Sequence, residues 1–136
     1  MHEIQQVRRF IVVDDDPTNN LVCEHILKRN FNHAHINLFT EPEKALRYIS
    51  EHYSNVDERI STVILLDINM PIISGWEFLE EFGTLSDAVR SQFTIFMLSS
   101  SVDERDKEQA EKNPFVSGFF SKPLSIDQLT ASIYKR

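Results

Sequence analysis

Residues 61–75 read STVILLDINMPIISG, and this stretch decides how the rest of the chain is interpreted. Residues 63–66 form an aliphatic run without polar alternation, which is typical of a strand covered on both faces in a parallel sheet. Asp67 follows at the carboxyl end of this strand, where ligands bind in open α/β sheets. An Asp that only begins the turn before Pro71 and Gly75 would give the same pattern, so both interpretations stay open on this stretch alone.

The composition describes one soluble, acidic domain. The chain has 136 residues, of which 41% are hydrophobic and 26% charged, and its formal net charge is -7. We therefore expect a single domain over residues 1–136, with its core in about residues 8–135. An acidic chain is a poor partner for nucleic acid, because binding to phosphates requires basic patches. No apolar segment of membrane-spanning length occurs, so we expect no membrane association and a cytoplasmic location.

The cysteine and histidine content argues against disulfide bonds and against metal sites built from these residues. Cys23 is the only cysteine, so the chain forms no internal disulfide and no cysteine-based metal site. The five histidines show no spacing typical of metal ligands.

Apolar runs alternate with helical patterns along the whole chain. The predicted strands cover residues 8–13, 34–39, 63–66, 93–98 and 116–120. A helix is predicted after each strand, although the third helix has no clear end between residues 83 and 90. This alternation is typical of a doubly wound α/β fold, in which helices cover both faces of a parallel sheet. For five strands the usual arrangement is the flavodoxin-like order 2-1-3-4-5, which the sequence alone does not fix.

Several helix starts are predicted from capping signals. A Ser or Thr followed three residues later by Glu or Gln has the spacing of a capping box. This spacing occurs at Thr40 and Glu43, at Ser74 and Glu77, at Ser101 and Glu104, and at Ser125 and Gln128. Asp16 before Pro17 predicts a further N-cap. The helix predicted over residues 102–113 is almost entirely charged, so we expect it to be exposed and weakly packed.

Polar side chains at the carboxyl ends of parallel strands would converge on one edge of the sheet. They are Asp14, Asp15, Asp67, Ser99 and Lys122. Carboxylates gathered in this way repel one another unless a cation binds, and their hard oxygen ligands suit Mg²⁺. With Mg²⁺ and Lys122 balancing the charge, the carboxylate of Asp67 could accept a phosphoryl group. Ser99 could then donate a hydrogen bond to the phosphoryl oxygens.

Four segments resemble the motifs of the receiver domain of two-component response regulators, which is related to CheY-like chemotaxis regulators. They are FIVVDDDP at 10–17, LLDINMPIISG at 65–75, MLSSS at 97–101 and FFSKPL at 119–124. Together these segments span nearly the whole chain, and the combination is highly specific.

The resemblance implies a role for each residue at this edge. Asp67 would be the phosphoacceptor, assisted by Lys122 and Ser99. The Mg²⁺ site would consist of Asp14, Asp15, Asp67 and the backbone carbonyl of Asn69. Ser99 and Phe119 would form the conformational switch, and Pro123 would follow a cis peptide bond. Ser99 stands where the family often has Thr, and Phe119 where it often has Tyr; lacking a hydroxyl, Phe119 should favour an inward, buried rotamer.

The resemblance also implies partners. A histidine kinase or a histidine phosphotransfer protein would supply the phosphoryl group, and a downstream protein would read the result. The contact face would comprise the helix over 102–113, the fifth strand and the last helix. Such a protein catalyses only its own phosphorylation and dephosphorylation, so we do not expect an enzyme. Whether the chain acts alone or is a piece of a hybrid kinase stays open.

Two other functions are compatible with parts of the sequence. Residues 14–18 also read D-x-D-x-T, the motif of haloacid-dehalogenase-type phosphatases, in which Asp14 would be the nucleophile and Asp16 the general acid. Such enzymes need a further acidic pair near the carboxyl terminus, and after Lys122 only Asp127 remains. This interpretation also leaves Asp67 without a role. A receiver-like interaction module that is never phosphorylated would explain the fold but not the complete set of site residues.

Overall fold

The computed structural model describes residues 7–55, 57–101 and 103–134. These residues form a five-stranded sheet in which every neighbouring pair is parallel and the order is β2-β1-β3-β4-β5. The strands are β1 (Arg9–Val13), β2 (His35–Phe39), β3 (Thr62–Asp67), β4 (Phe93–Ser99) and β5 (Val116–Ser121). The doubly wound fold and the order 2-1-3-4-5 are therefore confirmed, and each strand lies within one residue of its predicted bounds.

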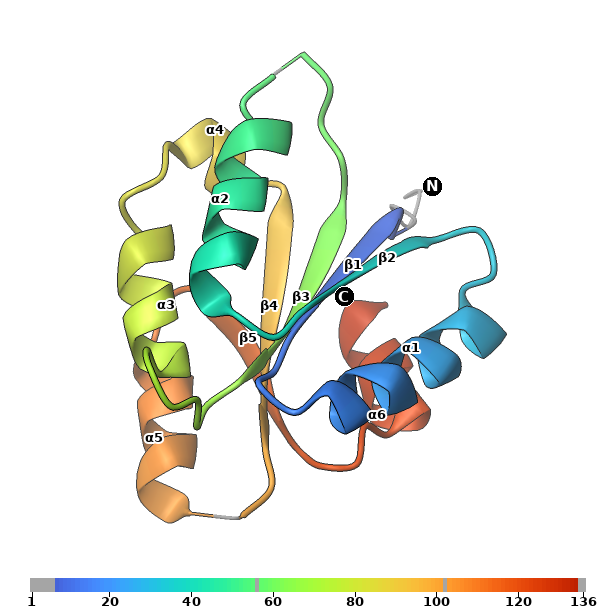
Figure 1. Cartoon of the computed structure of the whole chain (residues 1–136), viewed down its shortest axis with the longest axis vertical. Helices are drawn as coiled ribbons and strands as arrows, with labels where there is room; N and C mark the ends of the chain where they lie inside the picture. Colours follow the sequence, from blue (N-terminus) through green and yellow to red (C-terminus); the bar gives the residue numbers. More distant parts are fainter. Residues whose placement is uncertain (1–6, 56, 102, 135–136) are drawn as a thin grey trace.

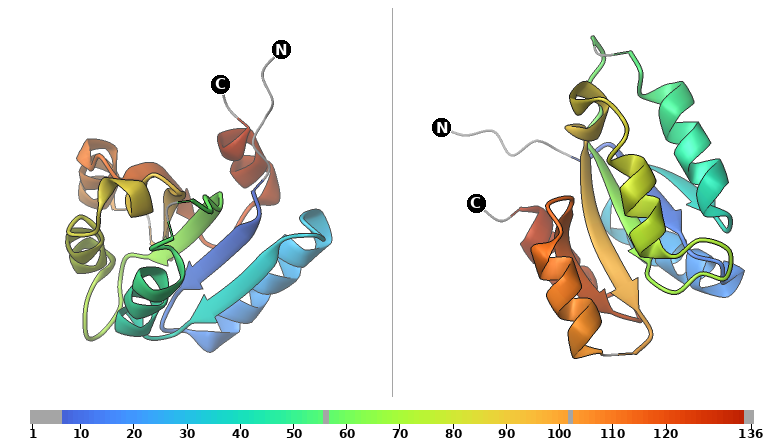
Figure 2. Two further views of the ribbon diagram at one scale, coloured as in Figure 1. Left: turned by 90° about the horizontal axis from the view of Figure 1, so that it is seen from above. Right: turned by 90° about the vertical axis from the view of Figure 1, so that its left-hand side faces the viewer.

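Helices cover both faces of this sheet. They are α1 (Pro17–Asn30), α2 (Pro42–His52), α3 (Gly75–Phe82), α4 (Asp87–Arg90), α5 (Glu104–Lys112) and α6 (Ile126–Ile133). Figure 1 shows α1 and α6 on one side of the sheet and α2 and α3 on the other. The turned views show the same layers around a twisted sheet (Figure 2). Among the described residues, no helix is both long enough and apolar enough to cross a membrane.

Two hydrophobic clusters hold the layers together, one on each face of the sheet. Along β1, Ile11 and Val13 pack into the cluster that contains residues of α2 and α3. The alternate residues Phe10 and Val12 pack into the cluster that contains Cys23 of α1 and residues of α6. Because successive side chains of a strand point to opposite faces, a central strand can be apolar throughout. This explains why β3, whose residues are all buried, shows no polar alternation.

The helix starts agree with the capping predictions at some positions and not at others. Ser74 forms a complete capping box with Glu77 at α3, and Ser125 caps α6 by accepting from the amide of Gln128. The prediction at Thr40 is wrong, since α2 begins at Pro42 and its N-cap is Glu41. Proline suits the first helical position because it has no amide hydrogen to satisfy there.

The predicted cap at Ser101 is also wrong. The N-cap of α5 is Asp103, whose side chain accepts from the amide of Arg105. Val102, where this helix was expected to start, lies outside the described residues. As expected, α5 is largely exposed, and Ala110 is the residue that it buries.

The sequence does not predict α4, which occupies the interval where the end of the third helix is unclear. Ser86 caps this short helix by accepting from the amide of Val89. Gln92, just beyond it, is buried and bonds to three backbone groups: its amide nitrogen donates to the carbonyls of Tyr53 and Ala88, and its oxygen accepts from the amide of Ile60. Gln92 thus ties α4 to the end of α2 and the start of β3.

Candidate functional site

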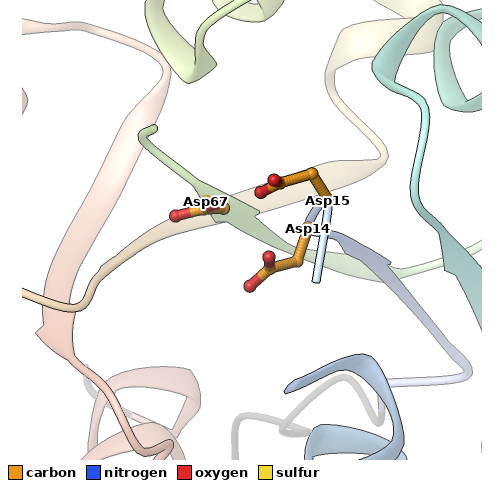
Figure 3. A group of neighbouring side chains, drawn as sticks. All are labelled: Asp14, Asp15 and Asp67. Carbon is orange, nitrogen blue, oxygen red and sulfur yellow. The ribbon is translucent and has the colours of Figure 1, made fainter. Parts of the chain in front are cut away.

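An acidic pocket lies where the parallel strands end. Asp14 and Asp15 directly follow β1, and Asp67 is the last residue of β3. One carboxylate oxygen from each of the three lies within 4.8 Å of the others (Figure 3). Asp14 and Asp67 are only 1% and 4% exposed, whereas Asp15 faces solvent. The neighbouring strand ends thus form a partly buried cluster of carboxylates with one open side.

Lys122, which follows β5, neutralises part of this negative charge. Its Nζ lies 2.7 Å from Oδ2 of Asp14 and 3.3 Å from Oδ1 of Asp67. The lysine side chain is 16% exposed, so both ion pairs are largely shielded from water. The backbone amide of Lys122 also donates to the carbonyl of Ser99, which fixes the start of this loop against the end of β4.

The pocket shifts the protonation equilibria of two of its members. Burial, followed by the negative charge of Asp14, raises the pKa of Asp67 from 3.8 to about 6, although Lys122 opposes the shift. Burial alone would lower the pKa of Lys122, but the hydrogen bonds and negative charges of Asp14 and Asp67 outweigh it and raise that pKa above 10.5. Lys122 is therefore protonated at neutral pH, whereas Asp67 gains or loses its proton at about pH 6.

The carboxylate of Asp14 is held by further donors. Its Oδ1 accepts from the backbone amide of Asp16 at 2.9 Å, and its Oδ2 accepts from Nδ2 of Asn19 at 2.7 Å. The side chain of Asn20 donates to the backbone carbonyls of Asp14 and Phe39, joining the ends of β1 and β2. Neither asparagine is among the site residues predicted from the sequence. Their position in the first turn of α1, directly after the acidic run, is the signal that could have identified them.

Ser99 and Phe119 lie outside the cluster of carboxylates. Ser99 is fully buried, and its hydroxyl donates to the carbonyl of Ser101 at 2.6 Å while accepting from the amide of Ser101. Phe119 of β5 is half-buried and packs against the core cluster that contains α2 and α3. Its burial is therefore less complete than expected for an inward rotamer.

Three other residues near the pocket have distinct surroundings. The side chain of Asn69 is exposed, two residues beyond Asp67. The peptide bond between Lys122 and Pro123 is cis. Gly75 begins α3 and lies against the strand end so closely that a Cβ would be 2.6 Å from the carbonyl oxygen of Asp67. Gly75 is therefore needed for this close approach, and not only for the turn suggested by its sequence context.

The donor set of the pocket fits a hard divalent cation. Three carboxylates offer oxygen atoms at mutual distances that one ion can span, and Asp15 leaves the site open to solvent. The structure does not favour the phosphatase arrangement, because Asp16 is the N-cap of α1 and accepts from the amide of Thr18. The phosphatase motif assigns no role to Asp67, yet Asp67 lies in the same carboxylate cluster as Asp14 and Asp15.

Comparison with known proteins agrees with this geometry. A family model described as the response regulator receiver domain matches residues 10–134. The chain belongs to this family. It is a CheY-like receiver domain of two-component signalling, as its sequence motifs predict, and the family binds a divalent metal and interacts with kinases and phosphotransfer proteins.

Solved structures similar to this receiver domain come from several bacteria. A response regulator receiver protein from Dyadobacter fermentans is 37% identical, with a TM-score of 0.81 over 90% of this chain and 91% of that one. A two-component response regulator from Cytophaga hutchinsonii is 29% identical, with a TM-score of 0.84 over 94% and 95% of the two chains. One from Burkholderia pseudomallei, described with a phosphorylated aspartic acid, a calcium ion and citrate, shares the fold at 15% identity and a TM-score of 0.69, over 94% and 67% of the two chains.

A curated relative places a similar segment inside a much longer protein. The 3',5'-cyclic-nucleotide phosphodiesterase regA of Dictyostelium discoideum is 25% identical over 137 residues. This alignment covers 94% of the receiver domain described here but only 16% of the phosphodiesterase.

Proposed function

We propose that this receiver domain accepts a phosphoryl group on the carboxylate of Asp67, from a phosphohistidine of a histidine kinase or a histidine phosphotransfer protein. The observation that carries the proposal is the position of Asp67: it is 4% exposed, lies 3.3 Å from Lys122 and shares a cation-sized space with Asp14 and Asp15. A carboxylate confined in this way is oriented for attack, and Lys122 already offsets part of the negative charge around it.

In this reaction an oxygen of Asp67 forms a bond to phosphorus while the bond from phosphorus to the histidine nitrogen breaks. Lys122 balances negative charge beside the acceptor oxygen. We assign Mg²⁺ to Asp14, Asp15, Asp67 and the backbone carbonyl of Asn69; when bound, the ion supplies positive charge for the phosphoryl oxygens. The phosphorylated aspartic acid described for the Burkholderia pseudomallei regulator supports the same chemistry here.

The proposed output surface comprises α5, β5 and α6. Ser99 would exchange its hydrogen bonds with Ser101 for one to the phosphoryl group, and Phe119 would repack in response. Two features support this assignment: α5 is held by little buried surface, and a surface pocket of about 90 Å³ is lined both by residues of α5 and by Phe119. A weakly packed helix beside a small pocket needs little free energy to shift. A downstream protein would bind this surface.

The same proposal covers the organisation of the chain. Residues 1–136 would make up one receiver domain that functions in the cytoplasm. The reactions that it catalyses would be its own phosphorylation and dephosphorylation.

Acetyl phosphate and Mg²⁺ provide a direct test, with the modified residue located by mass spectrometry of peptides. The proposal predicts a Mg²⁺-dependent gain of one phosphoryl group on Asp67 that is absent in Asp67→Asn. Asp16→Asn is the matched control, since it changes an exposed carboxylate outside the cluster and should still be phosphorylated. Modification of Asp14, or phosphatase turnover that survives in Asp67→Asn, would refute the proposal.

A further inference from the structure

Asn19 shares an acceptor atom with Lys122. Both Nδ2 of Asn19 and Nζ of Lys122 lie 2.7 Å from Oδ2 of Asp14. The other oxygen of this carboxylate is bonded to the amide of Asp16. Asp14 is only 1% exposed, so these protein donors take the place that water would take at a surface carboxylate.

The environment of Asn19 determines which side of its amide faces Asp14. Nδ2 also lies 3.8 Å from Sγ of Cys23, one turn further along α1. The Cys23 thiol is buried, and burial, together with the negative charge of Asp14, raises its pKa to about 11. The carboxylate and the sulfur both accept hydrogen bonds, so the NH₂ group has acceptors on this side. A rotated amide would place its oxygen against the carboxylate.

These contacts restrict the carboxylate of Asp14. Rotation of its plane would break the bonds to Asn19 and Asp16 together. Asn19 is neutral, so it satisfies Oδ2 without cancelling the negative charge that attracts a cation. Because Asn19 also donates to Asp14, Lys122 is not the sole side-chain donor to this carboxylate. Lys122 can therefore remain within reach of Asp67 as well.

We propose that Asn19 is a positioning residue of the cation site. Asn19 orients the carboxylate of Asp14 so that the negative charge of this carboxylate serves both the metal ion and Lys122. The proposal rests on the metal site assigned above. Donors that orient metal-binding carboxylates typically contribute 10-fold to 100-fold to metal affinity. Asn19 would act in this way through Asp14, without touching the phosphoryl group.

Calorimetric titration of the unphosphorylated protein with Mg²⁺ tests this assignment. Asn19→Leu keeps a similar size and removes the donor, so we expect Mg²⁺ binding about tenfold weaker or more. Asn19→Gln keeps an amide on a longer side chain and should recover part of the loss. Asn30→Leu is the matched control: Asn30 lies on the same helix and donates to the carbonyl of Ile26, so its loss should leave Mg²⁺ affinity unchanged. Circular dichroism verifies that each variant is folded.

The outcomes separate this inference from the proposed function. Mg²⁺ affinity of Asn19→Leu within twofold of the unsubstituted protein, or an equal loss in Asn30→Leu, would overturn the role of Asn19. A selective loss in Asn19→Leu would support it even if Asp67 were never phosphorylated. An unsubstituted protein that binds no Mg²⁺ would overturn both the metal site and this inference.

Discussion

Gly75 lies so close to Asp67 that an added Cβ would be 2.6 Å from its carbonyl oxygen, well inside van der Waals contact. The same Cβ would lie 2.8 Å from the terminal methyl group of Met97. The methionine side chain can move, but the carbonyl belongs to the end of β3, whose position sets that of the phosphoacceptor.

We therefore expect Gly75→Ala to destabilise the fold by about 1 to 3 kcal/mol and to slow phosphorylation of Asp67. Denaturant unfolding and the rate of labelling by acetyl phosphate measure the two effects. Gly83→Ala is the control, because its Cβ would meet the ring of Phe115 at 3.0 Å and no atom of the pocket. Labelling of Gly75→Ala at the normal rate would show that the strand end does not have to be held so closely.

Asp67 should reduce the stability of the metal-free protein at neutral pH. Its pKa is about 6 in the folded chain and 3.8 as an ordinary carboxyl group, so the folded state binds the proton more tightly. Between these values the folded state carries more protons than the unfolded state, and stability falls as pH rises. Asp67→Asn should therefore be more stable than the unsubstituted protein at pH 7, by up to about 3 kcal/mol.

This gain should diminish as pH falls through 6 and be absent below about pH 4. Thermal or urea unfolding over this range, with a chelator present, measures it. Asp57→Asn makes the same change at an exposed position and should have little effect at any pH. A gain of the same size at pH 4 and pH 7 would contradict the assigned cause.

Ser99→Ala should separate the phosphorylation of Asp67 from the conformational response of α5 and β5. The substitution removes both hydrogen bonds between the Ser99 hydroxyl and the backbone of Ser101, so we expect a loss of about 1 kcal/mol in stability. Asp67 should still be labelled, but labelling should no longer change hydrogen exchange in α5 and β5. Ser117→Ala, at an exposed position of β5, should retain that change. A normal response in Ser99→Ala would remove Ser99 from the switch.

Gln92→Leu should destabilise the fold without affecting the pocket. Three backbone groups lose a hydrogen bond to Gln92, although the carbonyl of Ala88 keeps one from the hydroxyl of Ser91. Each buried polar group left unsatisfied costs about 1 to 3 kcal/mol. We expect a total loss of about 3 kcal/mol in urea unfolding, because local water can replace part of the network. Gln128→Leu is the control, since Gln128 is exposed and should change stability by less than about 0.5 kcal/mol. Equal stabilities of the two variants would contradict the role assigned to Gln92.

The sequence predicts those parts of the fold in which local pattern and tertiary structure agree. The strands β1, β3 and β4 contain long apolar runs, and β2 and β5 are shorter apolar stretches with polar interruptions; all five positions are predicted within one residue. Ser74 and Ser125 act as helix caps at the positions that their spacing predicts. Thr40 does not, because Pro42 takes the first helical position and shifts the start of α2. The backbone of Ser101 is bonded to the Ser99 side chain, and Asp103 caps α5 instead.

The candidate site was predicted only in part for a related reason. Asp14, Asp15, Asp67 and Lys122 converge because parallel strands end at one edge, a property of the topology that alternating strands and helices already imply. Asn19 is different, because its importance depends on the direction in which one turn of α1 faces. The close approach of Gly75 likewise depends on the packing of α3 against the end of β3. The place of Asn19 in the first turn after the acidic run is its one local signal, and the close approach of Gly75 has none.

The acidic pocket draws its members from the ends of β1 and β3 and from the loop after β5, which are widely separated along the chain. No fragment that lacks the first or the last strand can therefore contain it. An unfinished chain on the ribosome that ends before β5 would carry the three carboxylates without Lys122, the cation that offsets part of their charge. The carboxylates and the lysine that offsets them thus come together only when the last strand has joined the sheet.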